Sequence, residues 1–233
     1  MSWTHPTTTR LGVRITDPRP PKSVHLVGLG PSGREFAWMW LNPETPELLT
    51  GRDEIWSVNR AVFGSVPHDL LFVMDNITNE AEQFPEYGER LWRHDRPIIT
   101  SDNLAGWPAH VLAYPYAEVM DWADRTFQVA RTDWFVNSMP FAMLYAAWIG
   151  VEELYLWGLD FVSHSSGKAV EDGHPNVAYW IAKIEEAGVK VVIPRSSSLC
   201  DANHREVFYG YQRDPRAASR FRRAEFYRRI GQC

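Results

Sequence analysis

The sequence predicts an α/β domain in which helices cover both faces of a mainly parallel sheet, a Rossmann-like arrangement. Three observations predict this fold class. Several short apolar runs show no alternation with polar residues, as expected for strands buried on both faces of a sheet. Segments with helical character separate these runs. A glycine-rich turn at residues 28–33 joins the first run to the first helical segment, a connection found in nucleotide-binding parallel sheets.

The elements follow in order along the chain. We expect strands at 24–30, 55–59, 70–76, 97–100, 111–114, 153–161 and 189–194. We expect helices at 34–41, 79–93, 140–150 and 176–187, the last two ending at the glycines of positions 150 and 188. Residues 117–135 fit neither pattern clearly, and residues 162–174 are expected to form a polar loop that holds two histidines.

The chain divides into three parts. Residues 1–22 carry four prolines among Thr and Arg and predict an irregular lead-in. Residues 23–205 hold all the expected strands and form a single nucleotide-binding domain. Residues 206–233 predict an Arg-rich helical tail. A chain of 233 residues is long enough for one domain with such attachments.

Composition narrows the class of protein. Apolar residues make up 45% and charged residues 23%, which is typical of a folded globular protein and excludes a disordered or collagenous chain. The longest apolar stretch, residues 139–151, is interrupted by Pro140 and Gly150 and is shorter than the roughly 20 residues a membrane-spanning helix needs. We expect no membrane span and no secretory leader. Cys200 and Cys233 form neither a disulfide framework nor a metal-site spacing, so a cytoplasmic location fits.

Charge is unevenly distributed along the chain. The whole chain carries −5, but residues 213–233 hold seven Arg against two acidic residues, net +5, which leaves −10 for the rest. This balance argues against nucleic-acid binding over the whole surface, whereas a local contact through the tail stays open. The arginines that would make it are Arg220, Arg222, Arg223, Arg228 and Arg229.

The glycine-rich turn carries the clearest chemical signal. Gly28, Gly30 and Gly33 match the G-x-G-x-x-G pattern, with Pro31 and Ser32 between them, and lie between an expected strand and an expected helix. Glycines let the backbone approach a phosphate, and a helix N-terminus offers free N–H groups. A tight turn without a ligand is the alternative.

Other strand ends offer further polar groups. A dinucleotide site needs an acidic residue at the end of the second strand, where this chain has Asn59 followed by Arg60. Arg60 suits the 2′-phosphate of NADP, and Asn59 suits a base, a ribose or a plain turn. Asp75 and Asp160 also end strands. The carboxylate of Asp75 could bind Mg²⁺ or the donor. The carboxylate of Asp160 could bind a sugar hydroxyl, orient a histidine or brace a loop.

Two more residues have both a structural and a functional interpretation. Ser138 begins a helix, which N-capping alone explains, although its hydroxyl would face the phosphate of a bound nucleotide. His174 lies in the expected loop. A histidine there can accept a proton from an acceptor hydroxyl, because its pKa lies near neutral pH, but a surface histidine explains it equally.

A longer pattern links these residues. The stretch from Ser138 through Gly150 to Gly158-Leu159-Asp160-Phe161 resembles the bacterial sialyltransferases of glycosyltransferase family 42. It is also similar to the flagellin-modifying Maf-type glycosyltransferases and the archaeal-type hydroxymethylpterin pyrophosphokinases. The matching positions elsewhere are Gly28, Gly30, Pro31, Ser32, Asn59, His174, Pro194, Ser198-Leu199 and Ala202-Asn203. Met139 and Phe135 stand where the family has Gly and Arg near the donor, so the donor sugar stays open.

The resemblance implies a single GT-A-like domain that moves a sugar from a nucleotide-sugar donor to a hydroxyl. The acceptor would be a glycan or, if the Arg-rich tail contacts DNA, a modified base in DNA. It implies no essential metal and no further cofactor, with His174 as the general base and Asp160 orienting donor or base. The nucleotide-binding residues would be Gly28, Gly30, Pro31, Ser32, Gly33, Asn59, Asp75, Ser138, Gly158 and Ser198.

Three other functions stay open. A pyrophosphokinase-like transferase would use ATP with Mg²⁺ and give Asp75 a role. An NADP oxidoreductase would use the glycine pattern and Arg60. A catalytically silent module would bind only a nucleotide or, through residues 213–233, a nucleic acid.

Overall fold

The structure is a computed structural model. The residues that it describes are 9–10, 13–14, 20–41, 53–64, 66–101, 104–127, 133–160, 167–194 and 197–200. Residues 201–233 lie outside these ranges, so the predicted helical tail and its arginines stay untested.

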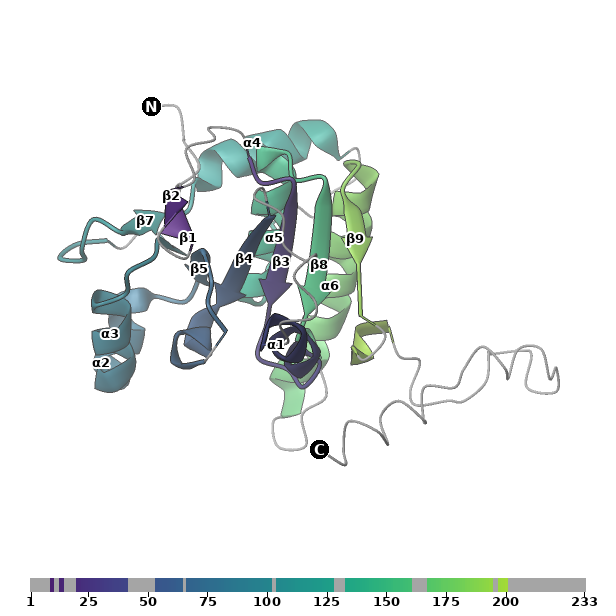
Figure 1. The fold of residues 1–233 in the computed structure, drawn as a ribbon. Coiled ribbons are helices and arrows are strands. Elements are labelled where there is room, and N and C mark those ends of the chain that lie inside the picture. Colours follow the sequence, from purple (N-terminus) through teal and green to yellow (C-terminus); the bar gives the residue numbers. More distant parts are fainter. Residues whose placement is uncertain are drawn as a thin grey trace, which may run out of the picture.

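A seven-stranded sheet forms the centre of the molecule (Figure 1). Its strands are β3 (Ser23–Val27), β4 (Asp53–Val58), β5 (Leu70–Val73), β6 (Ile98–Thr100), β7 (Val111–Ala113), β8 (Glu153–Trp157) and β9 (Lys190–Val192). The order across the sheet is β7-β6-β5-β4-β3-β8-β9, and every pairing is parallel. The α/β fold with a parallel sheet is therefore confirmed.

The strand order reverses once. From β3 the chain adds strands outward to β7 and then returns to the other side of β3 to form β8. Val27 pairs in register with Trp157, so β3 and β8 end level with each other. Loops that leave adjacent strands in opposite directions open a crevice at the carboxyl edge, where ligands bind in sheets of this kind.

Helices cover both faces of the sheet, as predicted. One face carries α4 (Tyr116–Thr126), α5 (Ser138–Ile149) and α6 (Gly167–Glu186), and the other carries α1 (Gly33–Leu41), α2 (Ile77–Gln83) and α3 (Pro85–Trp92). Neighbouring strand residues serve opposite faces. Leu26 belongs to the larger core cluster with α5 and α6, and Val27 to the cluster that contains Phe36 of α1.

Helix α5 is buried along most of its length. Nine of its residues are buried, which explains why its sequence is apolar on every side. The side chain of Asn137 accepts a hydrogen bond from the Met139 amide at its start, and Gly150 closes it with φ 89°. The predicted end of this helix is confirmed, and its start lies two residues earlier.

One helical prediction needs correction, and the ambiguous segment proves to be partly helical. The single helix expected at 79–93 is two helices, because Pro85 has no amide hydrogen to continue α2 and instead begins α3. The ambiguous segment 117–135 holds all but the first residue of α4, which ends at Thr126. Its buried residues Val119 and Ala123 are four positions apart, and this period is the signal for a helix.

The prediction of a loop at 162–174 is also wrong in part. Helix α6 begins at Gly167 and runs through Pro175, so His174 lies inside a helix. Val177, Trp180 and Ile184 are fully buried on one face of α6. Such packing stabilises the helix enough to accommodate the one backbone hydrogen bond that a proline removes.

The irregular lead-in contains one regular element. Strands β1 (Thr9–Arg10) and β2 (Val13–Arg14) pair antiparallel. Only Leu11 and Gly12 separate them in the sequence, and a two-residue connection with glycine is a hairpin signal. Among the described residues, none of the helices combines the length and apolar character required to span a bilayer.

Candidate functional site

The candidate residues gather at the carboxyl edge of β4, β3 and β8. Gly28 follows β3, Asn59 follows β4 and Gly158 follows β8. In Figure 1, α1 lies directly beyond the arrowhead of β3. We call residues 28–33, 59, 137–138 and 158–160 the switch edge, because the strand order reverses there.

The turns after β3 and β8 cross in direct contact. Gly28 N donates to Trp157 O over 2.7 Å, and Gly30 N donates to Gly158 O over 2.8 Å. Gly158 has φ 67°, and a Cβ added to it would lie 2.5 Å from Gly28 O. A Cβ added to Gly28 would lie 2.6 Å from Gly158 O. Contact between the two turns therefore requires these glycines.

Asp160 ties three loops together. Its Oδ2 accepts from the Ser32 amide at 2.5 Å, and its Oδ1 accepts from the Ser198 amide at 2.9 Å. The Ser32 hydroxyl in turn accepts from Gly158 N at 2.9 Å. A carboxylate thus lies next to the start of α1, where a negative charge is favoured by the helix dipole. Asp160 braces the loops after β3, β8 and β9.

The glycine loop consequently uses most of its amides within the protein. Besides those of Gly28, Gly30 and Ser32, the Gly33 amide donates to Gly30 O over 3.0 Å. Pro31 has no amide hydrogen and is exposed. A phosphate bound by these amides would have to replace existing hydrogen bonds.

Asn59 and Ser138 form a second contact on the same edge. Ser138 Oγ donates to Asn59 Oδ1 over 3.0 Å, which joins the end of β4 to the start of α5. Asn59 has φ 48°, a left-handed conformation that asparagine tolerates better than most residues. The sequence predicted both positions but did not predict this contact.

Asn137 is a residue whose ligand-binding potential the sequence did not reveal. Its Oδ1 caps α5, while its Nδ2 is buried and has no hydrogen-bond partner among the described residues. A buried donor without an acceptor is costly, and a ligand oxygen would satisfy it. The N-terminus of α5 also favours negative charge. In the sequence, the Asn-Ser pair before an apolar helix indicates only a helix N-cap.

Met139 connects the two halves of the switch edge. Its Cε lies 2.6 Å from the position that a Cβ on Gly28 would occupy. Met139 therefore fills space between the glycine loop and the first turn of α5. Glycosyltransferase family 42, which the sequence resembles, has a glycine at this position.

His174 reaches the same region from α6. Its Nε2 hydrogen-bonds with the Leu199 carbonyl oxygen in the 3-10 helix η3 (Ser198–Cys200). Since a carbonyl only accepts, the proton of this bond lies on Nε2. Asp160 holds the Ser198 amide, one residue before Leu199. The predicted pair His174 and Asp160 is thus connected through η3.

Asp75 and Arg60 lie outside this hydrogen-bonded group. Asp75 is exposed, and its charge contributes, after burial and Glu80, to raising the pKa of Tyr87. The Arg60 guanidinium lies 4.1 Å from the Phe84 ring centre, a cation–π contact. Among the described residues, no three His, Cys, Asp or Glu side chains are grouped so as to hold a metal ion.

Comparison with known proteins gives structural similarity alone. No protein-family profile and no curated protein matches the chain. The sialyltransferase CstII from Campylobacter jejuni in complex with CMP-3FNeuAc is 14% identical, with a TM-score of 0.45 over 73% of this chain and 79% of that one. A sialyltransferase Cst-II complex with CMP and a trisaccharide acceptor is 14% identical, with a TM-score of 0.44 over 74% and 80%. Values this low do not transfer an activity from one protein to another.

Proposed function

We propose that the chain is a glycosyltransferase that moves a sugar from a nucleotide-sugar donor to a hydroxyl group. One structural observation carries the proposal. The strand order reverses between β3 and β8, and the glycine loop, Asn59 and Ser138 lie together at that edge. A parallel sheet binds nucleotides at such a point. The motif resemblance of residues 28–203 supports the choice of transfer chemistry.

The donor phosphate is proposed to lie at the N-terminus of α5 and not within the glycine loop. The loop amides are bonded inside the protein, whereas Asn137 Nδ2 has no partner among the described residues. The Ser138 hydroxyl and the positive end of the helix dipole add to this site. Asn59 would hydrogen-bond the ribose or base. Gly28, Gly30 and Gly158 would provide a flat backbone surface beside it.

The proposed transfer is a single displacement. The acceptor oxygen forms a bond to the anomeric carbon of the sugar as the bond from that carbon to the donor phosphate breaks, so the configuration inverts. The acceptor proton passes to His174, and the nucleotide leaves with the bonding electrons. Because its proton lies on Nε2, where it bonds to Leu199 O, His174 accepts the proton of the acceptor hydroxyl at Nδ1.

Asp160 is proposed as a positioning residue. Its carboxylate fixes the Ser198 amide, and the next residue supplies the carbonyl that holds His174. Loss of this carboxylate would release both η3 and the glycine loop. No divalent metal takes part in the proposed transfer, so chelation with EDTA is expected to leave the activity unchanged.

The test compares two histidines. Consumption of nucleotide sugars is followed by chromatography for the wild type, His174→Ala and His110→Ala. His110 is a matched control, because its Nε2 also bonds to a backbone carbonyl, that of Leu91, away from the switch edge. We expect His174→Ala to lose transfer by about 10²-fold or more while it still binds the donor. Full activity in His174→Ala would contradict the assignment.

A further inference from the structure

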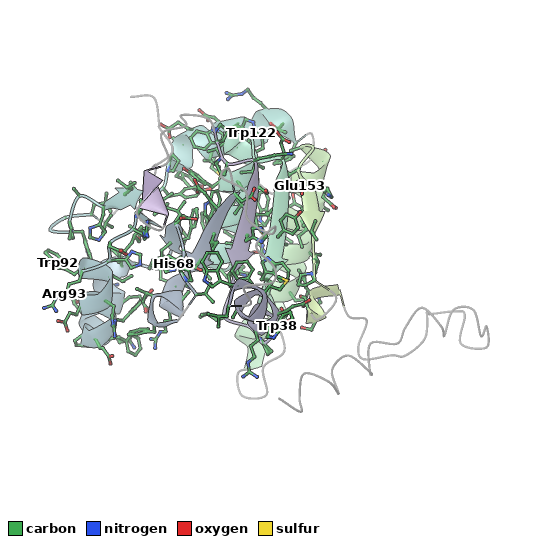
Figure 2. The ribbon with its side chains drawn as sticks, in the orientation of Figure 1. Trp38, His68, Trp92, Arg93, Trp122 and Glu153 are labelled. Atoms are coloured by element: carbon green, nitrogen blue, oxygen red, sulfur yellow. The ribbon has the colours of Figure 1, made fainter. Side chains whose placement is uncertain are left out.

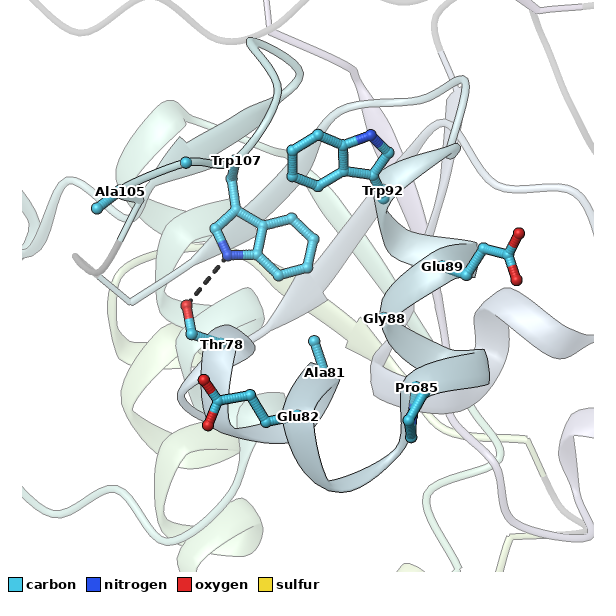
Figure 3. A pocket seen from close by; sticks show the side chains of 10 residues that line it. Thr78, Ala81, Glu82, Pro85, Gly88, Glu89, Trp92, Ala105 and Trp107 are labelled. Carbon is cyan, nitrogen blue, oxygen red and sulfur yellow. Dashed lines mark hydrogen bonds between the residues drawn. The ribbon is translucent and has the colours of Figure 1, made fainter.

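A shallow, open cavity lies outside the switch edge, between α2, α3 and residues 104–107 (Figure 3). Its volume is about 440 Å³, within the range of small-molecule sites. Its walls are mostly apolar, with Ala81 at its base. A Cβ added to Gly88 would lie 2.6 Å from the Ala81 Cβ, so the two helices are in close contact beneath the cavity.

Two tryptophans form one wall. The ring centres of Trp92 and Trp107 are 5.7 Å apart, with 47° between the planes. Trp107 Nε1 donates to Thr78 Oγ1 over 3.1 Å, which fixes the orientation of its ring. Trp92 is 51% exposed, unusual for so large an apolar side chain. The protein thus presents an oriented aromatic surface to solvent.

Two acidic residues line this surface. Figure 3 shows Glu82 on α2 beside it, whereas the Glu89 carboxylate on α3 points away from the two tryptophans. Both side chains are exposed, and Glu89 Oε1 pairs with Arg93 Nη2 over 2.9 Å. Ionised carboxylates only accept hydrogen bonds, so a ligand held here must donate them.

We propose that this cavity binds a saccharide. The apolar face of a sugar ring would stack on Trp92 and Trp107, and its hydroxyl groups would donate to Glu82. An ammonium group fits less well, because the ion pair with Arg93 offsets the charge of Glu89.

The saccharide is the acceptor of the transfer, an assignment that rests on the proposed function. Pro85 lines the cavity and follows Phe84, whose ring lies under the Arg60 guanidinium. Arg60 in turn follows Asn59 of the switch edge. Contacts between neighbouring residues therefore connect the cavity to the proposed donor site.

Calorimetric titration of the full chain tests the binding. The probes are lactose, N-acetyllactosamine, cellobiose and chitobiose, with choline chloride as the cationic comparison. Trp92→Ala removes the exposed indole. Trp38→Ala is the matched control, because Trp38 is 65% exposed on α1, and Figure 2 shows it well apart from Trp92.

We expect at least one of the four saccharides to bind, and Trp92→Ala to weaken that binding about tenfold or more. Trp38→Ala should leave the affinity unchanged. The proposal is overturned if none of the four binds, if Trp92→Ala binds as the wild type does, or if choline alone binds. Nucleotide binding is measured in separate titrations, so a failure of the proposed donor site does not affect this result. If transfer occurs, Trp92→Ala should raise the KM for the acceptor and leave that for the donor unchanged.

Discussion

The buried hydroxyl of Tyr87 has no hydrogen-bond partner in the part of the chain that the structure describes. Its side chain is 2% exposed, and none of the described residues hydrogen-bonds its oxygen. Burial, with the charges of Glu80 and Asp75, raises the pKa of Tyr87 above its usual value, so the phenol is neutral at ordinary pH. Burying an unpaired hydroxyl costs free energy, which the native packing has to offset.

Tyr87→Phe should therefore leave the free energy of unfolding unchanged or raise it by about 1 kcal/mol. Tyr114→Phe is the control. Tyr114 is also buried, but its hydroxyl donates to Phe141 O over 3.1 Å, so its loss should destabilise by about 1 kcal/mol. Urea denaturation measures both. A larger loss for Tyr87→Phe than for Tyr114→Phe would show that the Tyr87 hydroxyl is bonded.

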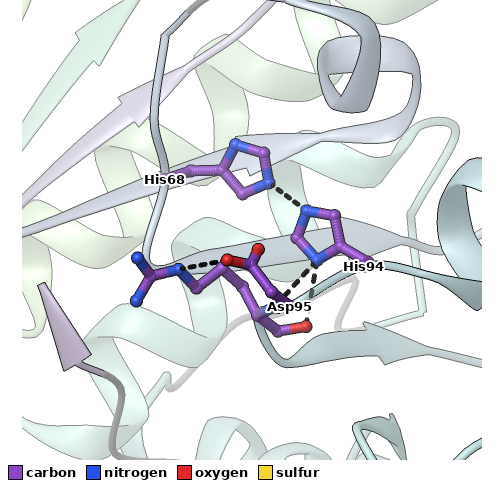
Figure 4. Close-up of polar contacts among 4 residues, drawn as sticks. His68, His94 and Asp95 are labelled. Atoms are coloured by element: carbon purple, nitrogen blue, oxygen red, sulfur yellow. Dashed lines mark hydrogen bonds and ion pairs between the residues drawn. The ribbon is translucent and has the colours of Figure 1, made fainter. Parts of the chain in front are cut away.

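His68 and His94 share a single hydrogen bond (Figure 4). Their Nε2 atoms are 3.0 Å apart, and their rings stack with centres 4.9 Å apart. Burial, followed by the charge of His94, lowers the pKa of His68 to about 4. Burial also lowers the pKa of His94. Both imidazoles are therefore neutral in the native state at pH 7.

This pair should make stability depend on pH. The unfolded chain protonates His68 near pH 6.5 but the native state only near pH 4. The unfolded state thus binds more protons between these values, and stability falls as the pH drops through that window. The loss from His68 is on the order of 2 kcal/mol, allowing for partial solvent exposure. His68→Leu should flatten the profile of unfolding free energy between about pH 7 and about pH 4. An unchanged slope would contradict the low pKa.

At the scale of elements, the crossing turns after β3 and β8 are the most constrained part of the switch edge. Gly158 combines φ 67° with a backbone oxygen 2.5 Å from any added Cβ. Gly106 has a similar φ of 85° but nothing within 4 Å. Alanine substitution at the two glycines therefore distinguishes the free-energy cost of a left-handed backbone conformation from that of a steric clash.

Gly106→Ala should destabilise by about 1 kcal/mol, and Gly158→Ala by about 3 kcal/mol or more. Thermal unfolding of the two variants measures the difference. If Gly158→Ala lost no more stability than Gly106→Ala, the turns would not be in contact. Gly158→Ala should also weaken any ligand at the switch edge, since Gly28 and Asp160 depend on the same turn.

Strands were easier to predict than helix boundaries. A strand such as Leu70–Val73 is buried on both faces, so its apolar run identifies it without further information. Helix boundaries depend on context. Pro85 begins a helix whereas Pro175 lies inside one, and buried contacts of Val177, Trp180 and Ile184 distinguish the two cases. Such contacts are not visible in a sequence.

For the whole molecule, the sequence predicted where polar groups end strands but not how they pair. Asp160 and Ser32 are 128 positions apart, and their hydrogen bond depends on the strand order. That order places β8 beside β3, which no local pattern specifies. The same holds for Trp92 and Trp107, whose contact depends on the packing of α3 against the loop before β7.

The location of ligand groups also depends on the whole fold. The glycine pattern alone suggested that its own amides hold a phosphate. The structure shows Asp160 bonded to the Ser32 amide, and the side-chain Nδ2 of Asn137 at the start of α5 has no partner among the described residues. The proposed phosphate position therefore follows from packing between elements distant in the sequence.

Binding of a nucleotide sugar at the switch edge is the central claim, and thermal shift tests it most directly. The Tm of the wild type, Asn59→Ala and Asn79→Ala is measured in the presence of CMP, UDP, GDP and their sugars, and of ATP–Mg²⁺ and NADPH. Asn79, exposed on α2, is the matched control. A ligand at about 100 times its Kd stabilises the native state by about 2.7 kcal/mol. We predict a rise in Tm with one nucleotide and its sugar, retained in Asn79→Ala and reduced in Asn59→Ala. A shift only with NADPH or ATP–Mg²⁺, or an equal shift in both variants, would contradict the claim.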